Sequence, residues 1–350
     1  VCPGSALAKN DAVEGEYIIK YKAGVDASTK SKVLNEHALE NRKNFKIINA
    51  QLVKLPAGQL QAQSTSSLLE ELADDPAVEY IEPNYYLYPM GTPISEDNYA
   101  ANLWGLKNYG QIINGYTGLE GMDINLAPAW LITQGDPNVL VAVIDTGVDI
   151  LHPDLVDAIW TNEIERYGID GFDDDGNGYD DDIYGWDFRN GDNSVFDSAS
   201  VDYHGTHCAG IIAAARDATG VVGTAPGVKI LPLKFMDADS GTTVTAISAI
   251  EYAKAVGAKI VNCSWGGPGE QALYDAIANS GMLFIAAAGN SAQNIDNTPL
   301  YPASFDLTNI ITVAAIDNQG SLASFSNSSS NYGPQSVDVA APGLYIYSTL

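Results

Sequence analysis

Residues 14–84 alternate between strand-like and helix-like patterns. Residues 28–42 carry apolar side chains at helical spacing behind a Ser28 or Thr29 N-cap, and residues 64–76 form a second capped helix that ends at Pro76. Strand-like alternation or short apolar runs occupy 16–22, 45–50, 51–58 and 77–83. The resulting order, βαββαβ, predicts a small α+β domain of the ferredoxin-like kind.

From residue 139 onward, near-continuous apolar strands alternate with helices. The expected strands are 139–145, 228–237, 258–267, 282–290, 309–316 and 336–343, and the expected helices are 204–215, 242–257 and 270–281. Continuous apolar strands between helices indicate a parallel sheet that is covered on both faces, which is an α/β fold. In such sheets the functional residues gather at the carboxyl ends of the strands.

These patterns divide the chain into four parts. Residues 14–88 form the small domain, 89–138 are a loop-rich linker together with the start of the next unit, and 139–350 form the α/β domain. Residues 1–13 contain "SALA", which resembles a signal-peptidase site, so this part is either the remnant of a secretory signal or a disordered terminus. The first alternative predicts a secreted protein.

Charge and composition exclude several classes of protein. The formal net charge is −27, and most of it lies after residue 90. Such an acidic surface repels nucleic acid and anionic lipid, and it suits calcium binding or solubility. No apolar run is long enough to span a membrane. Three cysteines cannot form a disulfide framework, and Cys208 and Cys263 lie in apolar runs that predict burial.

Two segments contain residues that could act in catalysis or bind a metal. Asp145 ends an apolar strand, where a carboxylate is costly unless it has a partner, although a turn carboxylate is the ordinary alternative. His204 and His207 lie three residues apart before a run of small residues. The pair could ligate a metal, or one histidine could act as a base at the start of a helix, or both could be structural. No third ligand of the expected type lies nearby in sequence, which argues against a zinc site.

Three motifs, "VAVIDTGVD" (141–149), "HGTHCAG" (204–210) and "AAAGN" (286–290), together resemble those of the subtilisin-like serine proteases, or subtilases. The resemblance covers residues 14–350, with 14–88 similar to the family's inhibitory propeptide. It implies a subtilisin-like sheet and an Asp-His-Ser triad, in which His204 is the general base and Asp145 orients its imidazole. Asn290 would donate to the oxyanion, and His207 would point into the core.

The resemblance also implies how substrate binds. Ser264, Trp265 and Gly266 match the extended segment that pairs with the substrate backbone. Ala287, Ala288 and Gly289 would form a wall of the first specificity pocket, whose small residues imply a roomy apolar pocket. Trp265 would narrow the adjoining subsites. The expected partners are extended peptides or proteins and the chain's own propeptide, and we expect a monomer.

A calcium site is predicted by the spacing of acidic residues in 173–182. Oxygen-bearing side chains alternate from Asp173 and are followed by Gly178, as in the first half of an EF-hand loop. Position 12 is Tyr184 rather than Glu, so the loop is not a true EF-hand. The expected ligands are Asp173, Asp175, Asn177, Tyr179 and Asp182. The alternative is a solvated acidic loop without an ion.

A second calcium site is implied by the resemblance alone. Asp154 stands where many subtilases have a ligand, and a loop further along the chain would complete the site. The residues of that loop are Asp217, Thr219 and Val221.

The chain departs from the family at the nucleophile. No serine in residues 1–350 lies in the family's Gly-Thr-Ser-Met-Ala motif. One hypothesis is a serine endopeptidase made as a zymogen, with its serine beyond Leu350, so that residues 1–350 alone are inactive. The alternative is a non-enzymatic calcium-binding or inhibitory module that kept the fold.

Overall fold

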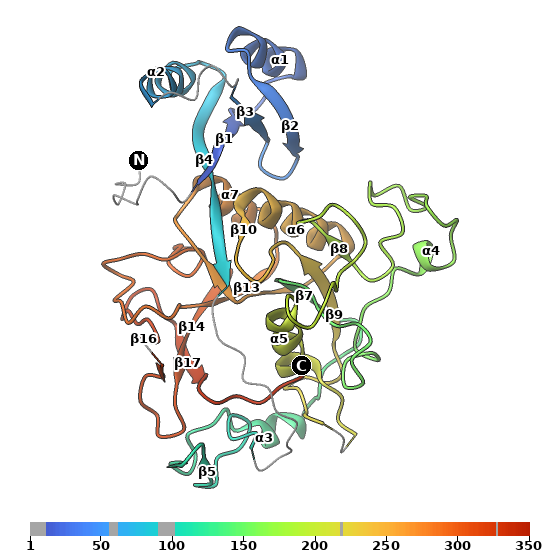
Figure 1. Cartoon of the computed structure of the whole chain (residues 1–350), viewed down its shortest axis with the longest axis vertical. Coiled ribbons are helices and arrows are strands. Elements are labelled where there is room, and N and C mark those ends of the chain that lie inside the picture. The colour runs from blue at the N-terminus through green and yellow to red at the C-terminus, as the bar shows by residue number, and fades with distance from the viewer. Residues whose placement is uncertain (1–11, 56–61, 90–101, 218–219, 327) are drawn as a thin grey trace.

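The computed structural model describes residues 12–55, 62–89, 102–217, 220–326 and 328–350 (Figure 1). The N-terminal domain contains β1 (Ala12–Tyr21), α1 (Ala27–Glu36), β2 (Glu40–Phe45), β3 (Ala50–Lys54), α2 (Ala62–Ala73) and β4 (Val78–Pro89). Its strands form an antiparallel sheet in the order β4-β1-β3-β2. The predicted βαββαβ order is confirmed.

The first helix differs from its prediction at both ends. Its N-cap is Asp26, whose side chain accepts a hydrogen bond from the Thr29 backbone N–H at 2.8 Å. The helix ends at Glu36, and residues expected to continue it form β2 instead. Ala38, at φ 53°, turns the chain between the two elements. Pairing with β3 therefore overrides the helical spacing of residues 37–42.

The larger domain is built on a seven-stranded parallel sheet in the order β17-β14-β13-β11-β7-β9-β8. These strands are β7 (Leu140–Asp145), β8 (Trp186–Asp187), β9 (Lys229–Lys234), β11 (Ile260–Cys263), β13 (Leu283–Ala287), β14 (Ile310–Ile316) and β17 (Val339–Pro342). The α/β fold with a covered parallel sheet is confirmed. None of the described helices combines the length and apolar character needed to cross a bilayer.

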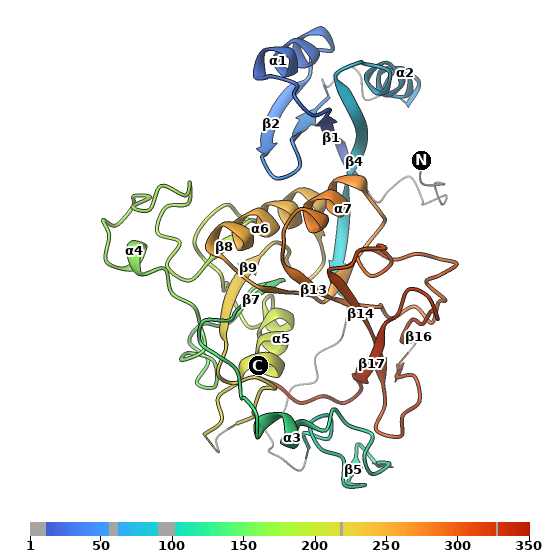
Figure 2. The same ribbon diagram turned by 180° about the vertical axis from the view of Figure 1, so that it is seen from behind.

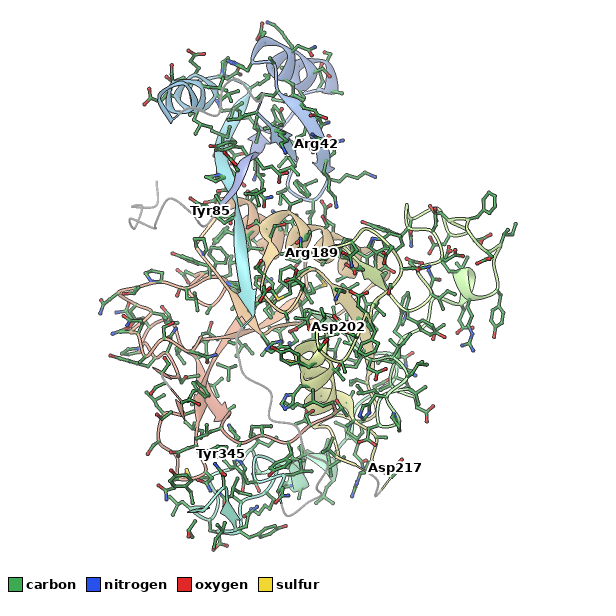
Figure 3. All side chains as sticks on the ribbon, viewed as in Figure 1. Arg42, Tyr85, Arg189, Asp202, Asp217 and Tyr345 are labelled. Atoms are coloured by element: carbon green, nitrogen blue, oxygen red, sulfur yellow. The ribbon has the colours of Figure 1, made fainter. Side chains whose placement is uncertain are left out.

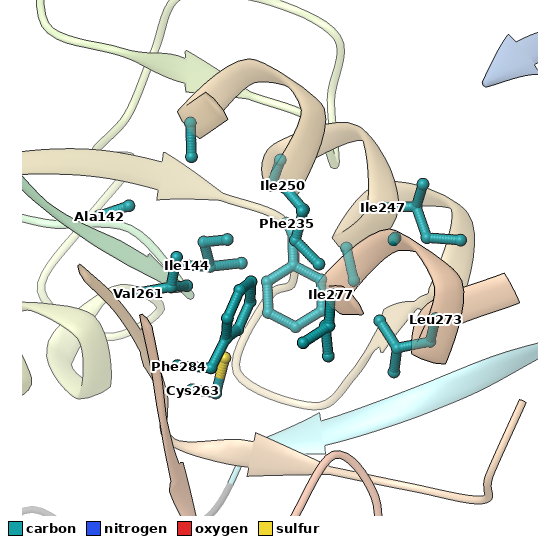
Figure 4. Close-up of a cluster of buried hydrophobic side chains, with 14 of the residues drawn as sticks. Ala142, Ile144, Phe235, Ile247, Ile250, Val261, Cys263, Leu273, Ile277 and Phe284 are labelled. Carbon is teal, nitrogen blue, oxygen red and sulfur yellow. The ribbon is translucent and has the colours of Figure 1, made fainter. Parts of the chain in front are cut away.

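Helices cover both faces of this sheet (Figures 1 and 2). α6 (Thr243–Val256) and α7 (Gln271–Ala278) lie on one face, where Ala142 and Ile144 of β7 pack among their apolar residues (Figure 4). α5 (Tyr203–Ala213) lies on the other face, against Val141 and Val143. The alternation of β7 side chains between two cores explains why the strand is continuously apolar. The remaining helices, α3 (Leu126–Trp130) and α4 (Glu163–Arg166), are short.

The two domains share a buried cluster and a strand. Apolar residues of the small domain pack in the same cluster as α6 and α7; they are Ile18, Phe45, Ile48, Ala50 and Leu52. β4 continues past its own sheet and runs between β10 (Gly241–Thr242) and β12 (Trp265–Gly266), pairing antiparallel with both. In Figures 1 and 2 it extends from the small domain across the larger one toward β13 and β14.

Candidate active site

Asp145 and His204 meet at the carboxyl edge of the sheet. Asp145 is the last residue of β7, and His204 lies in the first turn of α5. His204 Nδ1 and Asp145 Oδ1 are 2.6 Å apart, and both side chains are buried. The Thr146 backbone N–H donates to the same oxygen at 2.7 Å. Asp145 Oδ2 is buried and has no hydrogen-bond partner among the described residues. A buried carboxylate in this state favours a cation beside it, which a protonated imidazole supplies.

Glycine allows this close approach. A side chain on Gly205 would overlap the carbonyl oxygen of Gly147 and reach 3.1 Å from Asp145 Cβ. The Gly205 backbone N–H donates to Thr146 Oγ1 at 3.1 Å, which fixes the start of α5 against the end of β7. The small residues that follow His204 therefore serve to bring the imidazole to the carboxylate.

His207 and Cys208 do not form a histidine metal site. His207 is buried, and its Nε2 lies 3.2 Å from the Ile346 carbonyl oxygen. Burial lowers the pKa of His207 to about 4, so the ring is neutral at ordinary pH. This matches the structural role predicted for it. Cys208 offers its sulfur within 4.8 Å of Asp145 and His204 ligand atoms. Burial raises the pKa of the Cys208 thiol far above its usual range, so the thiol stays protonated.

Asn290 follows β13, which lies two strands from β7 and parallel to it. The carboxyl ends of these strands share one edge of the sheet, so Asn290 lies on the edge that carries Asp145. Gly289 adopts φ 98°, which favours glycine and turns the chain just before Asn290. Ala288 and Gly289 are buried, and Ala287 is half-buried.

The expected substrate segment pairs with a strand of this same chain. Gly266 lies opposite Tyr88 and Trp265 opposite Pro89 in the antiparallel pairing of β12 with β4. The prediction that Trp265 narrows the subsites is wrong, because its side chain is fully buried. Its indole N–H donates to the Ile144 carbonyl at 2.8 Å, and its ring packs on Phe235. Only the Trp265 backbone faces the paired strand. Ser264 Oγ accepts a hydrogen bond from Asn262 Nδ2 at 3.0 Å and lies 3.5 Å from Cys208 Sγ.

The acidic loop brings part of its predicted ligand set together. Asp173, Asp175 and Glu165 each place a carboxylate oxygen within 4.8 Å of the others. Glu165 was not predicted, because it lies in α4, outside the alternating pattern. Its Oε1 accepts hydrogen bonds from the Asp174 and Asp175 backbone N–H groups at 2.8 and 2.9 Å, which draws α4 onto the loop.

The other predicted ligands of this loop lie outside that carboxylate group. Asp182 is buried and accepts hydrogen bonds from Asn162 Nδ2 at 2.8 Å and Asn177 Nδ2 at 2.7 Å. Asn177 Nδ2 also lies 3.1 Å from Asp175 Oδ2, so the amide joins the two carboxylates. The Tyr179 ring packs edge-on against Trp186 and two other aromatic rings.

At the second predicted site, Asp154 is buried and its Oδ2 accepts a hydrogen bond from the Val221 backbone N–H at 2.9 Å. The loop that starts at Asp217 therefore returns to Asp154. Asp217 itself is exposed, at the lower end of the molecule in Figure 3. Thr219 lies outside the described residues.

Comparisons with known proteins agree with this architecture. A family model described as the subtilase family matches residues 136–349, and a model of the fervidolysin N-terminal prodomain matches residues 5–84. The chain is 34% identical over 348 residues to a thermophilic serine proteinase of Bacillus sp. (strain AK1), covering 98% of this chain and 73% of the relative. It is 36% identical over 232 residues to thermitase of Thermoactinomyces vulgaris, covering 65% of this chain and 70% of thermitase.

The fold is also that of a solved structure. The crystal structure of fervidolysin from Fervidobacterium pennivorans, described as a keratinolytic enzyme related to subtilisin, superimposes with a TM-score of 0.67 at 23% identity. The match covers 96% of this chain and 48% of fervidolysin, so this chain spans about half of that protein.

Proposed function

Because the chain belongs to the subtilase family and carries a fervidolysin-type prodomain, we propose that it is the zymogen of a secreted serine endopeptidase. The observation that carries the proposal is the 2.6 Å contact between Asp145 and His204 at the carboxyl edge of the sheet. In the proposed reaction His204 removes the proton from a serine hydroxyl as that oxygen attacks the peptide carbonyl. Asp145 holds the imidazole and stabilises the imidazolium, and the Asn290 amide donates to the oxyanion.

We place the nucleophile after Leu350, because residues 1–350 contain no serine in the Gly-Thr-Ser-Met-Ala motif. Two contacts support this placement. Ser348 Oγ donates to the His207 carbonyl at 2.6 Å, and Thr349 Oγ1 donates to the Thr206 carbonyl at 2.7 Å. They hold this part of the chain on α5, the helix that carries His204. By this proposal residues 1–350 alone bind extended peptides and hydrolyse them at a negligible rate.

The prodomain, for which we propose residues 14–88, acts as an intramolecular inhibitor. β4 occupies the position that an extended substrate would take, since it pairs with β10 through Leu87 and with β12 through Tyr88. Trp265 lies opposite Pro89, and Ser264, which precedes Trp265, lies 3.5 Å from Cys208 Sγ, one turn of α5 after His204. The pairing therefore brings the end of β4 close to the segment that adjoins the Asp145–His204 pair.

We further propose that calcium binds the acidic loop. Carboxylate oxygens are preferred ligands of this ion, and those of Glu165, Asp173 and Asp175 converge. The ion would neutralise their mutual repulsion and rigidify the loop against α4. Asp154, Asp217 and Val221 form a second candidate site, for which the Asp154–Val221 contact is the support.

Fluorophosphonate labelling tests the proposed function, because the probe reacts with an activated serine. We expect stoichiometric labelling of the protein extended beyond residue 350 once its prodomain has been removed, and none of residues 1–350. His204→Ala should abolish labelling, whereas His37→Ala in the prodomain should not. Labelling of residues 1–350 that His204→Ala blocks would place the nucleophile inside this chain. A folded, extended protein that neither labels nor hydrolyses peptides would favour the non-enzymatic module.

A further inference from the structure

Lys234 is a buried lysine beside the Asp145–His204 pair. It ends β9, where it stands opposite Asp145 in the parallel pairing with β7. Its side chain is only 1% exposed. Its Nζ donates to the Thr146 carbonyl at 2.7 Å and to the carboxylate of Asp202, and lies 3.2 Å from Asp197 Oδ2. One ammonium group thus contacts two separate segments of the chain.

Those two segments are the ones that present the pair. Thr146 follows Asp145 directly, and Asp202 lies two residues before His204, at the start of α5 (Figure 3). Asp202 also receives hydrogen bonds at Oδ2 from the backbone N–H groups of Asp197 and Ser198, at 2.5 and 3.1 Å. The carboxylate is therefore fixed to its own loop, and Lys234 links that loop to the end of β7, in addition to the Val148–Val195 backbone hydrogen bond.

A lysine is a costly residue for this position if packing were its only purpose. Removing an ammonium and a carboxylate from water costs free energy that their attraction often fails to recover, and an apolar side chain of similar size would fill the same space. What an apolar side chain cannot do is donate to Thr146 and Asp202 at once. The directed hydrogen bonds are the property that distinguishes Lys234 at this site.

We propose that Lys234, through its contacts with Thr146 and Asp202, is a positioning residue that sets the distance and angle between Asp145 and His204. It touches neither substrate nor the reacting atoms. The inference rests on the proposed function of the pair. The ammonium adds a charged link to the Gly205–Thr146 hydrogen bond, and we expect the register between the end of β7 and the start of α5 to shift when that link is removed.

The test compares Lys234→Met with Lys229→Met in the protein extended beyond residue 350. Lys229 lies on the same strand and its Nζ donates to a backbone carbonyl, that of Asp157, at an exposed position. We expect Lys234→Met to lower kcat per folded molecule about a hundredfold with KM within about twofold, as for a small misplacement of reacting groups. Lys229→Met should leave both constants unchanged. Loss of activity only in proportion to unfolded protein would overturn the inference.

A double variant guards against simple misfolding. Lys234→Met with Asp202→Asn removes the charges of both partners of the fully buried ion pair, so it should fold better than the single variant, yet it still lacks the donor to Thr146. We expect the same loss of kcat as in Lys234→Met. Wild-type kcat in the double variant would refute the positioning role.

Proton NMR gives a readout that does not depend on activity. The His204 Nδ1 proton, deshielded by its short contact with Asp145, should shift upfield or broaden in Lys234→Met and in the double variant, and stay unchanged in Lys229→Met. An unchanged signal in both Lys234 variants would overturn the inference. If the wild-type protein shows the signal but no protease activity, the proposed function fails while the positioning role is still measured.

Discussion

The prodomain supplies the helix cap of α7, and this predicts a pH-dependent inhibitor. Glu82 of β4 accepts hydrogen bonds from the backbone N–H groups of Gln271, at 2.6 Å, and Ala272. The helix's own N-cap residue, Glu270, makes no capping bond with its side chain. Burial raises the pKa of Glu82 from 4.5 to about 7, with Asp275 adding to the rise, while the two N–H groups and Lys20 oppose it.

The sign of the effect follows from this shift. The bound carboxyl holds its proton more tightly than the free one, so protonation favours the docked prodomain. Affinity is greatest below pH 4.5, falls as the pH rises from 4.5 to about 7, and then levels off. At about 1.4 kcal/mol per pKa unit, the shift corresponds to roughly 3 kcal/mol, or on the order of a hundredfold in the dissociation constant.

The assay uses a fluorescently labelled prodomain and mature enzyme carrying His204→Ala, so that binding is measured without proteolysis. Glu82→Gln mimics the protonated side chain and should show a weaker pH dependence between pH 4.5 and 8. The remainder comes from Glu270, whose pKa is also raised by burial and which accepts a hydrogen bond from the Tyr85 backbone. Glu79→Gln, on the exposed part of the same strand, is the matched control and should keep the wild-type pH dependence. A wild-type affinity that rises with pH, or equal slopes for wild type and Glu82→Gln, would refute the reasoning.

Three further predictions concern the metal loop, the helix contact and the processing bond. Chelation should lower the Tm of the protein, and added calcium should restore it. At a calcium concentration a hundredfold above Kd, binding adds about 2.7 kcal/mol to the free energy of unfolding. Asp175→Ala should remove this response and the exposed Asp170→Ala should not; an Asp175 variant with the wild-type calcium response contradicts the site. Gly205→Ala should abolish peptide hydrolysis by forcing α5 away from Gly147, as kinetics on the folded protein will check; wild-type kcat would show that the contact is dispensable. N-terminal sequencing of the mature enzyme should find cleavage between about Tyr85 and Glu96, because β4 pairs with the larger domain as far as Pro89; a mature N-terminus outside this segment contradicts the proposed boundary.

Asp145 and His204 could be singled out because their motifs are local. Asp145 ends an apolar strand and His204 begins a run of small residues, and the resemblance to subtilases, which rests on three such motifs together, implied their roles. Glu165 could not be predicted in this way. It lies in a short helix before the acidic loop, and only the folding of α4 onto that loop gives it a role. A carboxylate at that position is indistinguishable in sequence from an exposed one.

Trp265 and Lys234 are two further residues whose burial could not be predicted from local sequence. Trp265 stands in the substrate segment, so its ring was expected in the cleft, but alternation along β12 turns the side chain into the core while the backbone stays available. Lys234 ends an apolar strand, where a lysine is usually exposed. The structure buries it because carboxylate and carbonyl oxygens from two other segments converge there.

The elements and their order follow from the amino-acid sequence: the βαββαβ domain, the covered parallel sheet, and the motifs at the ends of its strands. Hydrophobic periodicity is enough to predict the helices and strands, because the spacing of apolar residues indicates which face of each element must be buried. Long-range contacts, by contrast, set three features: β2 replaces the last residues of an expected helix, β4 runs between β10 and β12, and Glu82 caps a helix of another domain. These contacts join residues far apart in the chain, and their partners are selected by packing and hydrogen-bond geometry, which no local pattern encodes.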